Sequence, residues 1–215
     1  HLSFFEVLFI GFLKWISSLD VEYIVLEVGL GGRFDATNSV DADIAVITSI
    51  ARDHQAYLGT RYEQILFEKI GIARSAKPLV TNFNLDYLNS LVRKHQIQTK
   101  FKWINQSSTI KQNFLDVNLG LVNGVLDILG IDSDKASIPD TFTPQIYDNM
   151  HISFYGSHNL DAVRKLVQFL SETHYNNVNN LDLIYLSFSQ REKKEIDQMV
   201  KLYLTLVNNK KEKLL

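Results

Sequence analysis

The order of apolar and polar residues predicts that helices alternate with short apolar strands through the first half of the chain. We expect helices over residues 3–19, 60–74 and 85–95, strands over 23–28, 43–48 and 79–81, and a short β segment near 101–104. The sequences Ser3-Phe-Phe-Glu6 and Thr60-Arg-Tyr-Glu63 both have the form of a helix capping box. This alternation is typical of a parallel sheet covered by helices.

The second half predicts another α/β unit after a break. A helix over 116–129 should end at Gly130, and residues 132–149 lack periodicity and contain Pro139 and Pro144. A strand (152–154), a helix (159–173), a strand (183–187) and a helix (192–207) follow. The expected fold is thus α/β: a parallel sheet with flanking helices in 1–131, a linker over 132–149, and a partial second α/β domain in 150–215.

Composition narrows the class of protein without fixing the function. Hydrophobic residues make up 46% and charged residues 21% of the 215 residues, as in ordinary globular proteins, and the net charge of −2 gives no basic field for nucleic acid. The absence of cysteine excludes disulfides and thiolate metal sites, and it permits a cytoplasmic location. The apolar run near the N-terminus is too short and too charged to cross a membrane.

The most informative segment is the apolar run 23–28 and the glycine-rich loop that follows it, residues 29–38. Glu27 lies near the end of the run. Ligands of open α/β sheets bind at the carboxyl ends of strands, so this carboxylate is well placed to hold a metal or a phosphate. The loop is not a dinucleotide fingerprint, because Phe34 stands where a third glycine would be needed.

The sequence of this segment, L-E-V-G-L-G-G-R-F-D-A-T-N over residues 26–38, resembles the signature of folylpolyglutamate synthases, including those that are also dihydrofolate synthases. They belong to the Mur ligase superfamily. Three more segments resemble that family in the same order: 45–54, ending in Asp-His; 57–73, with Y-L-G and E-K-I-G-I; and 155–159, Y-G-S-H-N. Four ordered matches are a specific signal, although each alone would be weak.

The resemblance implies an ATP-dependent ligase that adds L-glutamate to a folate or dihydropteroate carboxylate, with ATP and Mg²⁺ as cofactors. These are small-molecule partners; we expect no nucleic-acid or membrane partner and a monomer in the cytoplasm. By resemblance, Glu27 and His54 are magnesium ligands, and Lys69 is a catalytic lysine that carries a carbamate in the family. From the residues alone, Glu27 could instead pair with Arg33 or Lys69, and His54 could be an ordinary loop histidine.

The resemblance also implies nucleotide contacts from both halves of the chain. Arg33, Asp35 and Asn38 would shape the site near ATP and folate, while His158 and Asn159 would reach ATP, His158 also with a catalytic role. The structural alternatives are an Asx turn at Asp35 and a simple helix N-cap at Asn159.

Several departures leave other interpretations open. Tyr155 stands where the family has an acid, no G-x-x-x-x-G-K-[ST] phosphate loop is present, and the family's G-R-x-E segment has no counterpart. The chain also begins with His1, as an internal fragment would. The alternatives are therefore a degenerate non-catalytic relative or inactive fragment, and a ligase acting on cell-wall precursors.

Overall fold

The fold is given by a computed structural model. It describes residues 1–83, 85–94, 102–105, 114–132, 137, 145–147, 150–152, 155–157, 159–172 and 192–208. The chain divides into two compact units, one of His1–Ser107 and Gly120–Ser133, the other of Ser108–Leu119 and Asp134–Leu215. The domain boundaries expected at 131 and 150 stay a prediction.

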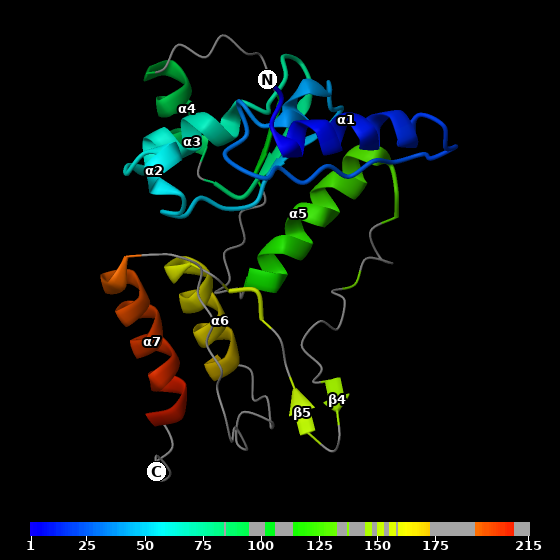
Figure 1. The fold of residues 1–215 in the computed structure, drawn as a ribbon. Coiled ribbons are helices and arrows are strands. Elements are labelled where there is room, and N and C mark those ends of the chain that lie inside the picture. The colour runs from blue at the N-terminus through cyan, green and yellow to red at the C-terminus, as the bar shows by residue number, and fades with distance from the viewer. Residues whose placement is uncertain are drawn as a thin grey trace. The chain divides into compact units, whose positions relative to one another are not determined.

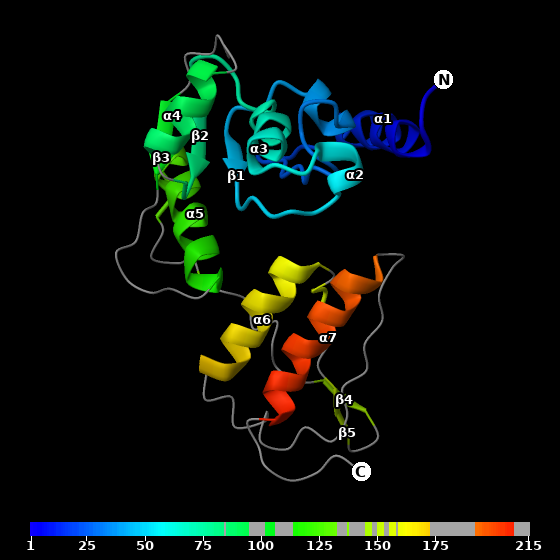
Figure 2. The ribbon, with the colours of Figure 1, turned by 90° about the vertical axis from the view of Figure 1, so that its left-hand side faces the viewer.

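The first unit is built on a three-stranded parallel sheet, as the alternating pattern predicted. Its strands are β1 (Ala45–Ile47), β2 (Pro78–Thr81) and β3 (Lys102–Asn105), in the order β1-β2-β3 (Figure 2). Ala45 pairs with Leu79, and Leu79 with Trp103. Parallel neighbours need crossover connections, and these contain the helices α2 (Gln55–Leu58), α3 (Tyr62–Ile70) and α4 (Leu85–Lys94).

Helix α1 (Phe4–Ile16) begins where the first capping box predicted. Ser3 Oγ accepts from Glu6 N at 3.3 Å, and Ser3 N donates to Glu6 Oε2 at 2.6 Å. The second predicted capping box is wrong, because α3 begins one residue later than Thr60 would require. Gln64 Oε1 accepts from Arg61 N at 3.1 Å, so the residue pair that closes this helix start is shifted by one position.

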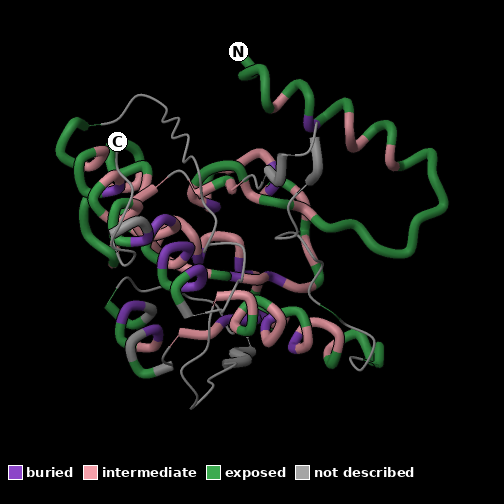
Figure 3. The backbone as a smooth tube through the Cα atoms, turned by 90° about the horizontal axis from the view of Figure 1, so that it is seen from below, coloured by how far each residue is buried: buried purple, intermediate pink, exposed green. Residues whose placement is uncertain are grey.

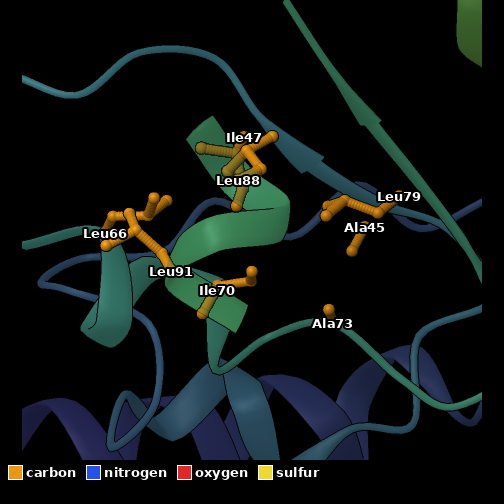
Figure 4. Close-up of a cluster of buried hydrophobic side chains, with 8 residues drawn as sticks. All are labelled: Ala45, Ile47, Leu66, Ile70, Ala73, Leu79, Leu88 and Leu91. Carbon is orange, nitrogen blue, oxygen red and sulfur yellow. The ribbon is translucent and has the colours of Figure 1, made fainter. Parts of the chain in front are cut away.

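The core of the first unit lies between the sheet and helices α3 and α4 (Figure 4). Buried side chains come from β1 and β2, from one face of α3, from the turn after it, and from α4. They are Ala45, Ile47, Leu66, Ile70, Ala73, Leu79, Leu88 and Leu91. Leu66 and Ile70 are spaced by four residues, as one buried face of a helix requires. This packing fixes the end of α3 relative to the sheet.

The predicted strand over residues 23–28 is wrong. No strand is present there, and the three-stranded sheet contains only β1, β2 and β3. The side chain of Val25 is 94% exposed, and Tyr23 and Ile24 are also exposed. An apolar run becomes a strand only when a neighbouring backbone pairs with it, and no strand of the described residues pairs with this run. Most of α1 is exposed in the same way (Figure 3).

Helix α5 (Phe114–Leu129) ends as predicted at Gly130, which has φ +68° and donates to Asp127 O at 3.3 Å. The second unit contains α6 (Leu160–Glu172) and α7 (Lys193–Asn208), which pack against one another around Val163, Leu166 and Met199. Both helices are labelled in Figure 1.

Two short antiparallel strands, β4 (Gln145–Tyr147) and β5 (Met150–Ile152), pair with one another, and β4 lies within the predicted linker. Strand β5 includes Ile152 of the strand predicted over 152–154, and residues 153 and 154 lie outside the described residues. The predicted strand over 183–187 lies outside the described residues. Within the helices that the structure describes, none has the length and apolar character to cross a membrane.

Candidate functional site

The glycine-rich loop lies against the last turn of α3. Arg33 N donates to Glu68 O at 2.8 Å, which joins the two segments through their backbones. Gly32 has φ +154°, and a Cβ there would lie 3.0 Å from the carbonyl oxygens of Glu68 and Lys69. The loop can approach the helix end this closely because position 32 has no side chain.

Arg33 is directed at α3. Its guanidinium lies 3.9 Å from the centre of the Phe67 ring, and Nη2 donates to Phe67 O at 3.2 Å. Its Nε is buried and has no hydrogen-bond partner among the residues that the structure describes. The cation–π contact and the carbonyl bond hold the side chain on the helix.

Asp35 organises the loop by accepting several hydrogen bonds. Oδ2 accepts from Gly29 N at 3.1 Å and Leu30 N at 3.0 Å, and Oδ1 accepts from Thr37 N at 3.0 Å and Thr37 Oγ1 at 2.6 Å. Asp35 is also the N-cap of the 3-10 turn η1 (Ala36–Ser39). Burial alone would raise the pKa of Asp35, but the hydrogen bonds from Thr37, Leu30 and Gly29 outweigh it and the pKa is lowered. The Asx-turn alternative from the sequence is present in the fold.

Asn38 bridges the loop and the turn after α3. Its Nδ2 donates to Arg33 O at 2.9 Å and to Gly71 O at 3.2 Å. Its Oδ1 accepts from Arg74 Nη2 at 2.9 Å. Sequence reasoning missed Arg74, since an arginine just beyond a helix gives no signal until the segment facing it is known.

Lys69, Asp53 and His54 share one neighbourhood. Burial lowers the pKa of Lys69, and the charge of Asp53 acts in the opposite direction. Asp53 Oδ2 lies 3.8 Å from His54 Nε2, and Asp53 Oδ1 accepts from His54 N at 2.8 Å. His54 has a left-handed backbone, φ 51° and ψ 36°, and its side chain is 47% exposed. The imidazole therefore faces solvent with a carboxylate beside it.

Glu27 is exposed and lies in the segment that forms no strand. It makes no ion pair with Arg33 or Lys69 in the described structure, so the alternative of a simple ion pair is not what the fold shows. The described part of the chain contains no group of three His, Asp or Glu able to hold a metal. The expectation that Glu27 and His54 are magnesium ligands stays a prediction.

A cavity of about 280 Å³ lies beside the glycine-rich loop. It is lined by residues of α1, of the glycine-rich loop, and of α2 and α3, among them Phe5, Leu30, Phe34, Asp35, Tyr57 and Glu68. Aromatic walls with three carboxylates, those of Glu6, Asp35 and Glu68, suit a planar, hydrogen-bonding ligand.

In the second unit, Asn159 is the N-cap of α6. Its Oδ1 accepts from Ala162 N at 2.8 Å, and its carbonyl accepts from Val163 N at 2.9 Å. Tyr155 packs, partly buried, against the apolar cluster of α6 and α7. His158 lies outside the described residues. The N-cap alternative for Asn159 is thus present, and a nucleotide contact from it stays a prediction.

Comparison with known sequences assigns most of the chain to one family. Residues 10–161 match the Mur ligase middle domain. The dihydrofolate synthase/folylpolyglutamate synthase of Escherichia coli (strain K12) is 51% identical over 79 residues, which are 37% of this chain and 19% of that protein. The corresponding protein of Bacillus subtilis (strain 168) is 45% identical over 71 residues, 33% of this chain and 16% of that protein.

Solved structures of folylpolyglutamate synthase/dihydrofolate synthases resemble the fold of this chain. E. coli FolC in complex with ADP superposes with a TM-score of 0.65 at 26% identity, over 80% of this chain and 48% of that chain. A bifunctional folylpolyglutamate synthase/dihydrofolate synthase with Mn, AMPPNP and L-glutamate bound gives 0.63 at 27% identity, again over 80% and 48%. The chain thus covers about half the length of these structures. Since the family match spans well over half of the 215 residues, the chain belongs to the Mur ligase family, through its middle domain.

Proposed function

We propose that the complete protein is an ATP-dependent ligase that adds L-glutamate to the carboxylate of a folate or dihydropteroate. The observation that carries the proposal is the glycine-rich loop, 29–38, packed on the end of α3 that bears Lys69. These two segments contain two of the sequence motifs that resemble those of the folylpolyglutamate synthases. The named activities of the E. coli and B. subtilis relatives support the same substrate class.

The reaction proceeds in two steps. The folate carboxylate attacks the γ-phosphorus of ATP, so an acyl phosphate forms and ADP leaves. The amine of glutamate then attacks the acyl carbon, the amide bond forms, the amine loses a proton and phosphate leaves. Both transition states are anionic, so the site must supply positive charge and hydrogen-bond donors.

The residues present fit a divalent cation in part. The Glu27 carboxylate is exposed and of the hard-oxygen type that Mg²⁺ prefers, and His54 would add an imidazole with Asp53 beside it. Magnesium keeps several waters and takes phosphate oxygens, so a small protein ligand set suffices. The bound cation would neutralise phosphate charge during transfer. The structure of a relative with Mn bound supports a divalent metal.

Lys69 is suited to the carbamate that the family resemblance implies. Carbon dioxide reacts only with a neutral amine, and burial lowers the pKa of Lys69 toward that state. Within this proposal, Arg33, Asp35 and Asn38 hold the loop beside the nucleotide and the folate. We assign the cavity next to Asp35 to the planar ring of the folate.

In the second unit, His158 and Asn159 would contact ATP from the start of α6. The N-terminus of a helix carries partial positive charge and free N–H groups, which attract phosphate. We expect the complete protein to act as a cytoplasmic monomer. The names of structures solved with ADP, or with AMPPNP and glutamate, support these small-molecule partners.

The test is release of ADP by the complete protein, measured with and without folate and glutamate. Activity that requires both, and that Glu27→Gln abolishes, would support the proposal. A complete protein that binds nucleotide but releases no ADP would indicate the degenerate relative. ADP release only with a cell-wall peptide precursor would indicate the other ligase branch.

A further inference from the structure

The Arg74 side chain has several hydrogen-bond and ion-pair partners, and the expected site residues do not include it. Its Nη1 donates to Ile72 O at 3.0 Å. Its Nη2 donates to Asn38 O at 2.8 Å, Asn38 Oδ1 at 2.9 Å and Val40 O at 3.1 Å. Its Nε lies 3.4 Å from Asp41 Oδ1. Every nitrogen of the guanidinium therefore has an oxygen partner.

These bonds join two segments that are far apart in sequence. Asn38 and Arg74 are 36 residues apart, and the bonds fasten η1 to the turn that follows α3. Asn38 continues the link by donating to Gly71 O and Arg33 O. The chain of contacts therefore runs from Arg74 through Asn38 to the backbone of the glycine-rich loop.

The same contacts reach the end of α3 that carries Lys69. Arg33 N donates to Glu68 O, and Gly32 lies close to the Lys69 carbonyl. The loop is thus held beside Lys69 by the hydrogen bonds that Asn38 makes to Arg74 on one side and to Arg33 O and Gly71 O on the other. A cation beside the carbonyls after a helix is also electrostatically favourable.

The geometry requires arginine in particular. A planar guanidinium presents donors in fixed directions, so one side chain reaches Ile72 O, Asn38 and Val40 O together. Lysine carries a single ammonium on a flexible stem and cannot span these oxygens. The Arg74 side chain is only 24% exposed, which protects its hydrogen bonds from water.

We infer that Arg74 is a positioning residue of the ligase site: it acts through Asn38 to hold the glycine-rich loop in register with Lys69. The inference rests on the proposed function. In this role Arg74 does not touch the substrate. Its effect is on the placement of groups that make such contacts.

The test compares Arg74→Ala, Arg74→Lys and the control Asp41→Asn in the complete protein. Asp41 is 73% exposed, and its substitution removes the ion pair but keeps the bonds from Arg74 to Asn38 and Val40. We expect kcat to fall about 100-fold in both Arg74 variants, as for a misplacement of about 1 Å. Asp41→Asn should keep kcat within about threefold of wild type, since exposed ion pairs contribute little.

Two further readouts separate positioning from mere loss of folding. Added guanidinium should restore a measurable part of kcat in Arg74→Ala, and circular dichroism at the assay temperature gives the folded fraction. The inference is overturned if Arg74→Ala keeps wild-type kcat, or if its loss matches the unfolded fraction and guanidinium restores nothing. A wild type that releases no ADP with folate and glutamate would instead overturn the proposed function.

Discussion

Gly71 offers a sharp test of how closely the glycine-rich loop packs on α3. A Cβ built at Gly71 would lie 2.5 Å from Arg33 Cβ and 2.7 Å from Arg33 Cα. Cα is a backbone atom and Cβ is fixed directly to it, so no rotation of the Arg33 side chain relieves the overlap. The backbone at Gly71 has φ −59°, which alanine adopts without strain. Gly71→Ala therefore probes packing alone.

The size of the effect follows from two opposing terms. Overpacking of a close contact destabilises by about 1–3 kcal/mol. Replacing glycine by alanine also reduces the entropy of the unfolded chain, which stabilises by about 0.4–1 kcal/mol where the backbone permits. The middle values of these two terms differ by a little over about 1 kcal/mol, so we expect Gly71→Ala to be destabilised by roughly 1–2 kcal/mol.

The assay is urea unfolding followed by circular dichroism, with Gly11→Ala as the matched control. Gly11 lies within α1 and a Cβ there would meet nothing within 4 Å, so alanine should stabilise by about 0.5–1 kcal/mol. With a slope of about 2 kcal/mol per molar urea, the Gly71→Ala midpoint should fall by about 0.5–1 M.

The two variants should therefore move the midpoint in opposite directions. An unchanged or higher midpoint for Gly71→Ala would refute the close packing of Arg33 on Gly71. A lowered midpoint for Gly11→Ala would show that glycine is needed in α1 for a reason other than space.

Three further predictions use other parts of the structure. Because the pKa of Asp35 is lowered in the fold, the ionised carboxylate should stabilise the folded state fully above the ordinary pKa of 3.8, and this stabilisation should be lost as the pH falls through the lower folded pKa. The difference in free energy of unfolding between wild type and Asp35→Asn should therefore shrink as the pH falls over that range, and a difference that stays constant with pH would contradict the prediction. Asn159→Ala should destabilise α6 by about 1 kcal/mol in thermal unfolding, whereas Asn159→Asp should keep the cap but weaken ATP binding through repulsion of phosphate, measured by calorimetry; unchanged ATP affinity would leave Asn159 as a cap only. Asp53→Asn should weaken Mn²⁺ binding by the complete protein by about 10–100-fold, as loss of the group beside a ligating histidine does; equal Mn²⁺ affinity would remove His54 from the metal site.

Much of the first unit could be predicted because its signals are local. The Ser3 capping box, the stop at Gly130 and the three strands of the parallel sheet depend on residues within a few positions of each other. Short-range hydrogen bonds and hydrophobic periodicity carry that information directly in the sequence. The start of α3 was missed by one residue, because Thr60 and Arg61 are each followed three positions later by a side chain, Glu63 or Gln64, that can accept a hydrogen bond from the backbone N–H at the helix start.

The strand over 23–28 failed for the opposite reason. Its apolar residues match a buried strand, but a strand is defined by hydrogen bonds to a neighbour, and local composition cannot supply the neighbour. Strand β4 was missed because Gln145–Tyr147 falls in the segment without periodicity, and β5 overlaps the predicted strand over 152–154 only at Ile152.

By itself, the sequence determined the longer helices, the parallel sheet, the family and the residue types of the candidate site, because these depend on local patterns and on motifs shared with the family. The short helix α2 was not predicted. Only the tertiary structure decided what those residues do within the fold. It directs Arg33 onto Phe67, engages both oxygens of Asp35 in the loop, and makes Arg74 the link to Asn38. These contacts join positions more than 30 residues apart or depend on a turn's exact path. Such contacts arise only when packing of α3 on the sheet brings the segments together, so no local pattern encodes them.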